Sequence, residues 1–96
     1  MIKHIVMFNF KNENKKENML KAKKMLEALL GSVPTLKSIE IGMNFAQEER
    51  AMDLSLYSEF EDEEALKLYT NHPEHLEVVK FIKSVALASK VVDYKI

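Results

Sequence analysis

Apolar and polar residues alternate with the period of a β-strand in several segments of the chain. Residues 2–10 place β-branched and aromatic side chains at nearly every second position, and residues 36–45 and 52–60 show the same alternation. A polar stretch of six residues, 46–51, separates the latter two segments, so together they predict a hairpin. Residues 90–96 predict a fourth, closing strand.

Helical spacing replaces this alternation between the first two strands. Apolar residues recur there at steps of three and four, which predicts a helix over residues 15–30. Asn14 and Glu17 have the spacing of a capping box at its start. Gly31 is placed to end the helix in a left-handed conformation.

A second helical region lies between the third and fourth strands and is divided by Pro73. Asp62 is expected to cap a short helix before the proline. Proline biases His72 away from helical geometry and is itself favoured at the first helical position, so His72 is expected to cap a second segment. The apolar stripe of that segment runs from His75 to Ala86.

The predicted order is strand, helix, strand, strand, helix, strand. This split βαβ repeat predicts an α+β, ferredoxin-like fold, in which both helices cover one face of an antiparallel four-stranded sheet. The 96 residues suffice for one domain, and no repeat, linker or low-complexity segment interrupts them. A single domain over residues 1–96 is expected.

The sheet face opposite the helices carries many apolar side chains. Four residues mark the helix side: Val6, Phe8, Leu54 and Leu56. Five mark the opposite side: Ile5, Met7, Tyr57, Val92 and Tyr94. Polar residues are interleaved with them, and a mixed face of this kind is typical of a protein interface. We therefore expect a homodimer in which two sheets face each other as a barrel; scattered exposed apolar residues on a monomer are the alternative.

Composition excludes several classes of function. The 14 basic and 15 acidic residues give a net charge of −1, which offers no electrostatic basis for binding nucleic acid or an anionic membrane. With no cysteine there is no disulfide, Cys zinc site or thiol nucleophile. No apolar run has the length of a membrane helix, and the N-terminal run is too short for a signal peptide, so a cytoplasmic location is expected.

Polar side chains interrupt the helix side of the predicted fold. His4 and Asp93 share that side on the first and last strands, which are neighbours in this topology, so they are expected to pair. Tyr69 and His75 lie on the apolar stripes of the two helical segments and are expected to point toward the sheet. Convergent Tyr and His side chains among apolar groups are typical of a small-molecule pocket. Purely structural roles for these residues are the alternative.

A Tyr and His pair of this kind has a definite chemistry. A neutral imidazole can remove a proton, and a phenol can donate a hydrogen bond to a developing enolate oxygen. A metal site is a weaker hypothesis, because His72 and His75 lack a third ligand. Neither a metal nor an organic cofactor is expected.

Five segments of the sequence resemble the stress-responsive A/B barrel (Dabb) family, and the resemblance covers essentially the whole chain. They are residues 1–6, 39–44, 58–60, 69–75 and 91–94, of which Asn71-His72-Pro73-Glu74-His75 is the most specific. The resemblance implies ferredoxin-like protomers that form homodimeric α/β barrels. It also implies a site, because a plant polyketide cyclase of this fold uses a Tyr and a His that match Tyr69 and His75 as its acid–base pair, without a cofactor. That cyclase also has pocket residues matching His4 and Asp93.

The chain departs from the cyclase at two positions. Leu54 stands where the cyclase has a third pocket histidine, and Ala86 stands where it has a tryptophan. The polyketide substrate is therefore not carried over.

Two functions stay open at this point. One is a small dimeric protein of ligand binding or stress response, with a pocket formed by these residues: His4, Val6, Phe8, Leu54 and Asp93. The other is a cofactor-free cyclase or isomerase that acts on a small carbonyl compound, with Tyr69 and His75 as catalytic residues. A cofactor-free monooxygenase is a third possibility, because related dimeric barrels include such enzymes.

Overall fold

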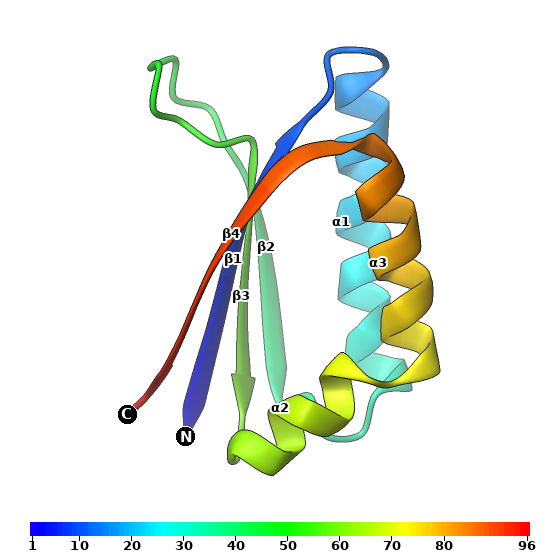
Figure 1. Ribbon diagram of the computed structural model, residues 1–96, viewed down its shortest axis with the longest axis vertical. Coiled ribbons are helices and arrows are strands. Elements are labelled where there is room, and N and C mark those ends of the chain that lie inside the picture. The colour runs from blue at the N-terminus through cyan, green and yellow to red at the C-terminus, as the bar shows by residue number, and fades with distance from the viewer.

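Four strands form one antiparallel sheet, and two long helices lie side by side along one face of it (Figure 1). The structure is a computed structural model that describes all residues, 1–96. The strands are β1 (Ile2–Phe10), β2 (Ser38–Met43), β3 (Leu54–Phe60) and β4 (Ala86–Lys95). The helices are α1 (Lys15–Ser32), α2 (Glu63–Thr70) and α3 (Pro73–Val85). The short α2 crosses one end of the sheet and leads into α3 (Figure 1).

The strand order is β2-β3-β1-β4, so the first and last strands are neighbours, as predicted. His4 lies opposite Ser58 on β3 and opposite Asp93 on β4. Side chains of directly opposed residues project from the same face of a sheet. The register therefore brings His4 and Asp93 together on the side that faces the helices, which we call the helix face.

The hydrophobic core lies between the helix face and the helices and contains 16 buried apolar residues. Strands β1 and β3 contribute Phe8, Phe10, Leu54, Leu56 and Phe60 to it. Helix α1 contributes the stripe that its spacing predicted: Met19, Ala22, Leu26 and Leu29. The period-two alternation of the strands therefore identified the helix face correctly.

The two ends of α1 differ from the sequence-based prediction. Asn14 occupies the cap position with a left-handed backbone (φ 53°), and its side chain makes no capping hydrogen bond, so the predicted capping box is wrong. The helix continues through Gly31, which has no positive φ, and ends at Ser32. The backbone leaves the helix in an extended conformation at Val33, and Pro34 then prevents another turn because it lacks an N–H.

The capping predictions for the other two helices are confirmed. The side chain of Asp62 accepts a hydrogen bond of 2.8 Å from the backbone N–H of Ala65. Nδ1 of His72 accepts one of 3.1 Å from the backbone N–H of Glu74, with Pro73 at the first helical position. His72 thus satisfies a backbone donor that the start of α3 would otherwise leave unpaired.

The bounds of three strands were predicted wrongly. Strands β2 and β3 are shorter than expected, because the Asn44 side chain bonds the backbone N–H of Ala46 and turns the chain away from the ladder. The connecting loop is therefore longer than the six residues expected. Strand β4 begins at Ala86, which was expected in a helix, because the ladder between β1 and β4 continues as far as Phe10.

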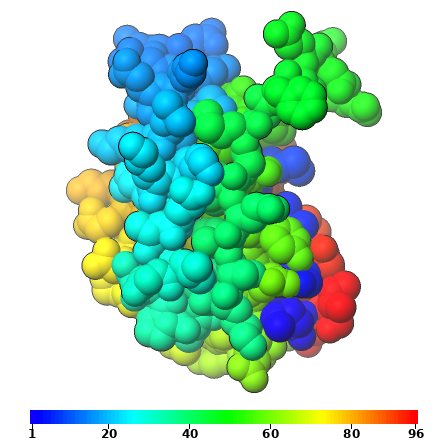
Figure 2. Space-filling model, turned by 180° about the vertical axis from the view of Figure 1, so that it is seen from behind, coloured from blue at the N-terminus to red at the C-terminus, as the bar shows by residue number.

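The loop between β2 and β3 projects from the body of the molecule. We call residues 44–53 the hairpin arm. It leans away from the helices, toward the side of the sheet that no helix covers, which we call the open face (Figure 1). Figure 2 shows the arm, in green, standing clear of the rest of the surface. Phe45 in this arm is 96% exposed. None of the helices has the length and hydropathy needed to cross a membrane.

Candidate functional site

A cavity of about 360 Å³ lies between α3 and the strands β1 and β4. Eleven of its 15 lining residues are hydrophobic. The polar groups that line it are the phenol of Tyr69 and the side chains of His4, His75, Lys83 and Ser89. Leu87, at the start of β4, lines the cavity and is 68% exposed, so the cavity opens to solvent between α3 and β4.

The structure brings five of the seven sequence-predicted site residues to this cavity: His4, Val6, Phe8, Tyr69 and His75. It does not bring the other two there. Leu54 is 1% exposed and packs in the core between Phe8 and Met43, its partners on the adjacent strands. Asp93 does not line the cavity; it pairs with His4, which does.

Other lining residues were missed by the sequence analysis as site residues. They are Leu26, Leu56, Val78, Val79, Ile82, Lys83 and residues 86–89. The apolar stripe of the second helical segment was a usable signal for Val79 and Ile82. Ala86 lies on the same stripe, whereas residues 87–89 gave no signal, because the closing strand was expected to begin only at residue 90.

Tyr69 places a hydroxyl group in the deepest part of this layer. Its side chain is 1% exposed, and its ring packs against Phe60 at 4.9 Å and His75 at 4.3 Å between ring centroids. The hydroxyl has no hydrogen-bond partner. Burial raises the pKa of Tyr69 to about 12. Because the phenol stays protonated at neutral pH, it can act as a hydrogen-bond donor to a bound molecule.

His75 is held in one tautomer by the backbone. Its Nδ1 lies 3.0 Å from the carbonyl oxygen of Thr70. A carbonyl only accepts, so Nδ1 carries the hydrogen and Nε2 keeps a free lone pair. Burial is the main cause that lowers the pKa of His75, and the nearby His4 and His72 lower it further, while the bond to Thr70 opposes them. The imidazole is therefore neutral at pH 7 and can accept a proton.

His4 and Asp93 form the predicted pair. Nδ1 of His4 is hydrogen-bonded to the Asp93 carboxylate, so this ring also carries its hydrogen on Nδ1 and keeps Nε2 as an acceptor. The ring of His4 lies 6.3 Å from the ring of Tyr69 between centroids. Asp93 itself is partly exposed, with 44% of its side chain accessible. The pair thus orients an imidazole toward the Tyr69 end of the cavity from the strand side.

These groups suit hydrogen bonding and proton transfer better than metal binding. Tyr69 offers one donor, and His4 and His75 each offer one imidazole acceptor. His72 uses its Nδ1 in the cap of α3. No three His, Asp or Glu side chains of the chain are arranged so that they could hold a metal ion together.

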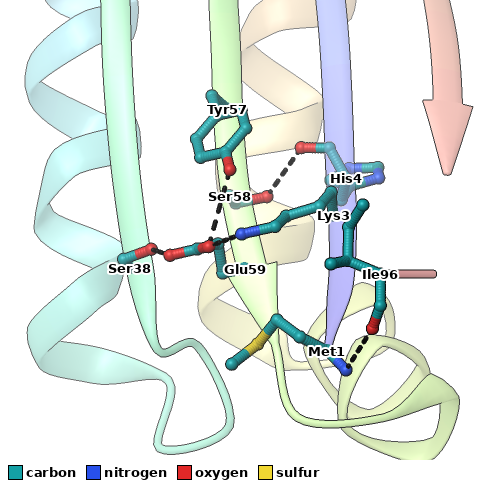
Figure 3. Close-up of polar contacts among 8 residues, drawn as sticks. All are labelled: Met1, Lys3, His4, Ser38, Tyr57, Ser58, Glu59 and Ile96. Atoms are coloured by element: carbon teal, nitrogen blue, oxygen red, sulfur yellow. Dashed lines mark hydrogen bonds and ion pairs between the residues drawn. The ribbon is translucent and has the colours of Figure 1, made fainter. Parts of the chain in front are cut away.

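The open face carries a different kind of polar arrangement (Figure 3). Lys3 on β1 forms an ion pair with Glu59 on β3. Ser38 on β2 donates a hydrogen bond to the same carboxylate, and the hydroxyl of Tyr57 lies 3.5 Å from it. Beside this network the predicted apolar residues are exposed, with Met7, Val92 and Tyr94 at 41%, 50% and 39%.

The whole chain is similar to several solved structures. A dimeric Bacteroides fragilis protein of unknown function and ferredoxin-like fold is 31% identical, with a TM-score of 0.89 over 99% of this chain and 95% of that one. An Arabidopsis thaliana protein is 24% identical, with a TM-score of 0.89 over 100% and 95%. A hydroxynitrile lyase from Passiflora edulis is 20% identical, with a TM-score of 0.88 over 99% and 92%, a likeness that shows the fold alone.

These structures confirm the predicted ferredoxin-like fold. No curated protein sequence matches the chain. The sequence model of the Stress responsive A/B Barrel Domain matches residues 2–96. The chain therefore belongs to the stress-responsive A/B barrel (Dabb) domain family, as its resemblance to that family implied.

Proposed function

We propose that this protein binds a small, mostly apolar molecule that carries an oxygen atom, and that it does so in the cavity between α3 and the strands β1 and β4. The volume of about 360 Å³ lies within the range of small-molecule sites. Its largely apolar lining favours an apolar ligand body. The few polar groups at the Tyr69 end select for a hydrogen-bonding group on that body.

The observation that carries the proposal is the hydroxyl group of Tyr69. Buried polar groups are almost always hydrogen-bonded, and an unpaired one costs about 1–3 kcal/mol. Tyr69 is 1% exposed, lines the cavity and has no partner within the chain. A ligand oxygen in the cavity supplies the missing acceptor, because no group of the chain accepts a hydrogen bond from the Tyr69 hydroxyl.

Proton transfer without a cofactor is a second candidate function, and the fixed tautomer of His75 favours it. Nε2 of His75 takes a proton from the carbon next to a ligand carbonyl group, and the Tyr69 hydroxyl donates a hydrogen bond to the enolate oxygen that forms. The reverse transfer returns a proton to the carbon. His4, held by Asp93, is a supporting residue whose ring packs near that of Tyr69.

Binding is tested by calorimetric titration with acetophenone and with ethylbenzene, which has the same ring and no oxygen. We expect acetophenone to bind about 5-fold more tightly, as one hydrogen bond implies. Tyr69→Phe should abolish that preference, and Tyr57→Phe on the open face should retain it. Equal binding of both compounds by the wild type, or no binding of either, would contradict the proposal.

Proton transfer is tested by following exchange of the methyl protons of acetophenone in heavy water by NMR. The wild type should accelerate exchange, and His75→Ala should reduce the rate to that of buffer. His72→Asn, which keeps a capping side chain, serves as the matched control. Binding of acetophenone without any acceleration would leave a binding protein and remove the catalytic candidate.

The quaternary structure belongs to the same proposal: this chain forms a homodimer through its open face. The Bacteroides fragilis protein is described as dimeric. The open face exposes apolar side chains that no element of the protomer covers. The hairpin arm with its exposed Phe45 leans over the same side (Figure 1), where a second copy can bury it.

A further inference from the structure

The two ends of the cavity differ in charge. Tyr69, His75 and His4 occupy the end near the start of α3, where a phenol and two imidazoles provide hydrogen-bonding groups and neither lysine nor arginine lines the wall. Lys83 lies near the end of α3 and is the only lining residue with a permanent charge. Eleven of the 15 lining residues, most of them between these ends, are hydrophobic.

The spacing of the two ends follows from the elements that carry them. His75, Val79 and Lys83 follow one another at four-residue steps along one side of α3. Eight residues of helix rise about 12 Å along the axis. On the opposite wall, His4 and Phe8 both line the cavity, and four residues of strand span about 13 Å. Both walls therefore set about the same distance between the imidazole end and the lysine end.

Lys83 has no counter-ion within the chain. None of the ion pairs of the protein includes it. Its neighbours three and four residues before it on the helix are Val79 and Lys80, and the residues three and four positions after it, Ala86 and Leu87, begin β4; none of the four is acidic. Lys83 is exposed and lines the apolar cavity, as does the exposed Leu87, so its charge belongs to the solvent-accessible part of the lining.

We propose that the ligand of the cavity is an amphiphilic carboxylate: a medium-chain acid whose carboxylate pairs with Lys83 at the mouth and whose far end carries a hydroxyl or carbonyl oxygen that reaches Tyr69. This rests on the proposed binding function and adds the charge, length and orientation of the ligand. The span of about 12 Å corresponds to an extended decanoate chain. Ser89, opposite Phe8 on the helix face of β4, adds a hydroxyl group at the mouth.

The opposite orientation is disfavoured by desolvation. A carboxylate at the inner end would lose its hydration beside the buried Tyr69, close to the Asp93 carboxylate that pairs with His4, and no lysine or arginine lines that end. At the mouth it keeps contact with water and gains the lysine. A neutral hydroxyl or carbonyl group loses far less on transfer to the inner end, where the Tyr69 hydroxyl lacks a partner.

Three probes of one chain length test this: ω-hydroxydecanoate, decanoate and the neutral α,ω-decanediol, each titrated calorimetrically into the folded protein at low ionic strength. The hydroxy acid should bind about 5-fold more tightly than the diol, which is the size expected for an exposed ion pair. It should also bind about 5-fold more tightly than decanoate, through the hydrogen bond at Tyr69. Added salt should reduce the first preference and leave the second unchanged.

Two variants separate the two ends of the ligand. Lys83→Met should abolish the preference for the acid over the diol and keep the preference for the hydroxyl group, and Tyr69→Phe should do the reverse. Lys80→Met, on the same helix but outside the cavity, should change neither preference.

Two results would overturn the inference and leave the binding proposal intact: equal affinity of acid and diol for the wild type, or an acid preference that survives Lys83→Met. Failure of all three probes while acetophenone binds would have the same consequence. If acetophenone also fails to bind, the binding proposal itself is wrong.

Discussion

The two faces of the sheet are built from the same strands but carry different kinds of polar group. On the helix face, the buried polar groups at the inner end of the cavity, the Tyr69 phenol and the His75 imidazole, are uncharged. On the open face the central polar group is an ion pair, Lys3 with Glu59, to which Ser38 donates a hydrogen bond. The difference lies in how much water each face keeps.

This contrast follows from the cost of removing charge from water. The inner end of the cavity is covered by the protomer's own helices, so an unpaired charge beside the buried Tyr69 would be desolvated, and neutral groups are tolerated there instead. The open face is solvated in the protomer and carries charges that are already paired and hydrogen-bonded before a second copy covers them. One face therefore fits a ligand and the other fits a protein partner.

The largest expected effect is the loss of dimer stability when a charge is placed on the open face. Val92→Asp places an unpaired carboxylate where two sheets are expected to meet, and a twofold dimer buries two copies. At about 3 kcal/mol for each uncompensated charge, the dimer should lose about 6 kcal/mol and dissociate at micromolar concentration. Light scattering coupled to size exclusion measures the mass.

Val91→Asp is the matched control for this variant. Val91 is adjacent on β4, is 62% exposed, and lies opposite Val6, so it belongs to the helix face. It should leave the dimer intact. A Val92→Asp protein that remains dimeric, or a wild type that is monomeric, would show that the open face is not the dimer interface.

The next largest effect is expected when a buried side chain of the helix face is truncated, which lowers the free energy of unfolding. Leu56 is 2% exposed and belongs to the core between sheet and helices. Leu56→Ala should lower the free energy of unfolding by about 3 kcal/mol, as buried leucine truncations do. Tyr57→Ala, its neighbour on the open face, should mainly weaken the dimer. Urea unfolding at several protein concentrations separates the two effects, and similar losses for both in the monomer would contradict the division of faces.

The sequence predicted the faces better than the ends of the elements. Period-two alternation assigned Leu56 and Tyr57 to opposite faces, because one register satisfies the whole strand at once. The ends of the elements depend on whether a residue continues a helix, turns, or joins a strand ladder, and the apolar pattern of the sequence does not record that choice. Gly31 stays helical because nothing requires it to turn, and Ala86 joins β4 because the ladder with β1 extends to it.

The cavity was predictable only in part, for a related reason. His4, Tyr69 and His75 interrupt apolar stripes, so the pattern itself marks them as unusual. Lys83 does not stand out in the sequence, because a lysine near the end of a helix is common on solvated surfaces. Its place at the mouth emerges only when the start of β4 and the end of α3 are placed side by side.

A smaller effect is expected from Tyr69→Phe on the empty protein. The variant removes a buried hydroxyl group that has no partner, and it keeps the ring packed against Phe60 and His75. The free energy of unfolding should stay the same or rise by up to about 1 kcal/mol. Chemical denaturation without ligand measures it. A loss of more than 1 kcal/mol would mean that the hydroxyl stabilises the fold, and the argument for an unfilled hydrogen bond would fail.

The smallest effect concerns the pH dependence that the neutral imidazole of the helix face should produce. The pKa of His75 is lowered in the folded protein, mainly by burial, from the ordinary value of about 6.5 that applies to the unfolded chain. As the pH falls below about 6.5, the unfolded chain takes up the proton first, so stability decreases with falling pH until the folded form is also protonated. Above that range the contribution does not change with pH.

His75→Asn tests this sign, because the Asn amide can still donate to the carbonyl of Thr70 where Nδ1 now does. His4 lines the same cavity as His75, and His72 lies at the start of the same helix. Both are present in wild type and variant alike, so the informative quantity is the difference in stability between the two proteins. The wild type should lose more stability than His75→Asn between pH 7 and pH 5. If the two proteins lose the same amount of stability, burial does not hold His75 neutral. The contrast between the uncharged inner end of the cavity and the ion pair of the open face would then be contradicted at His75.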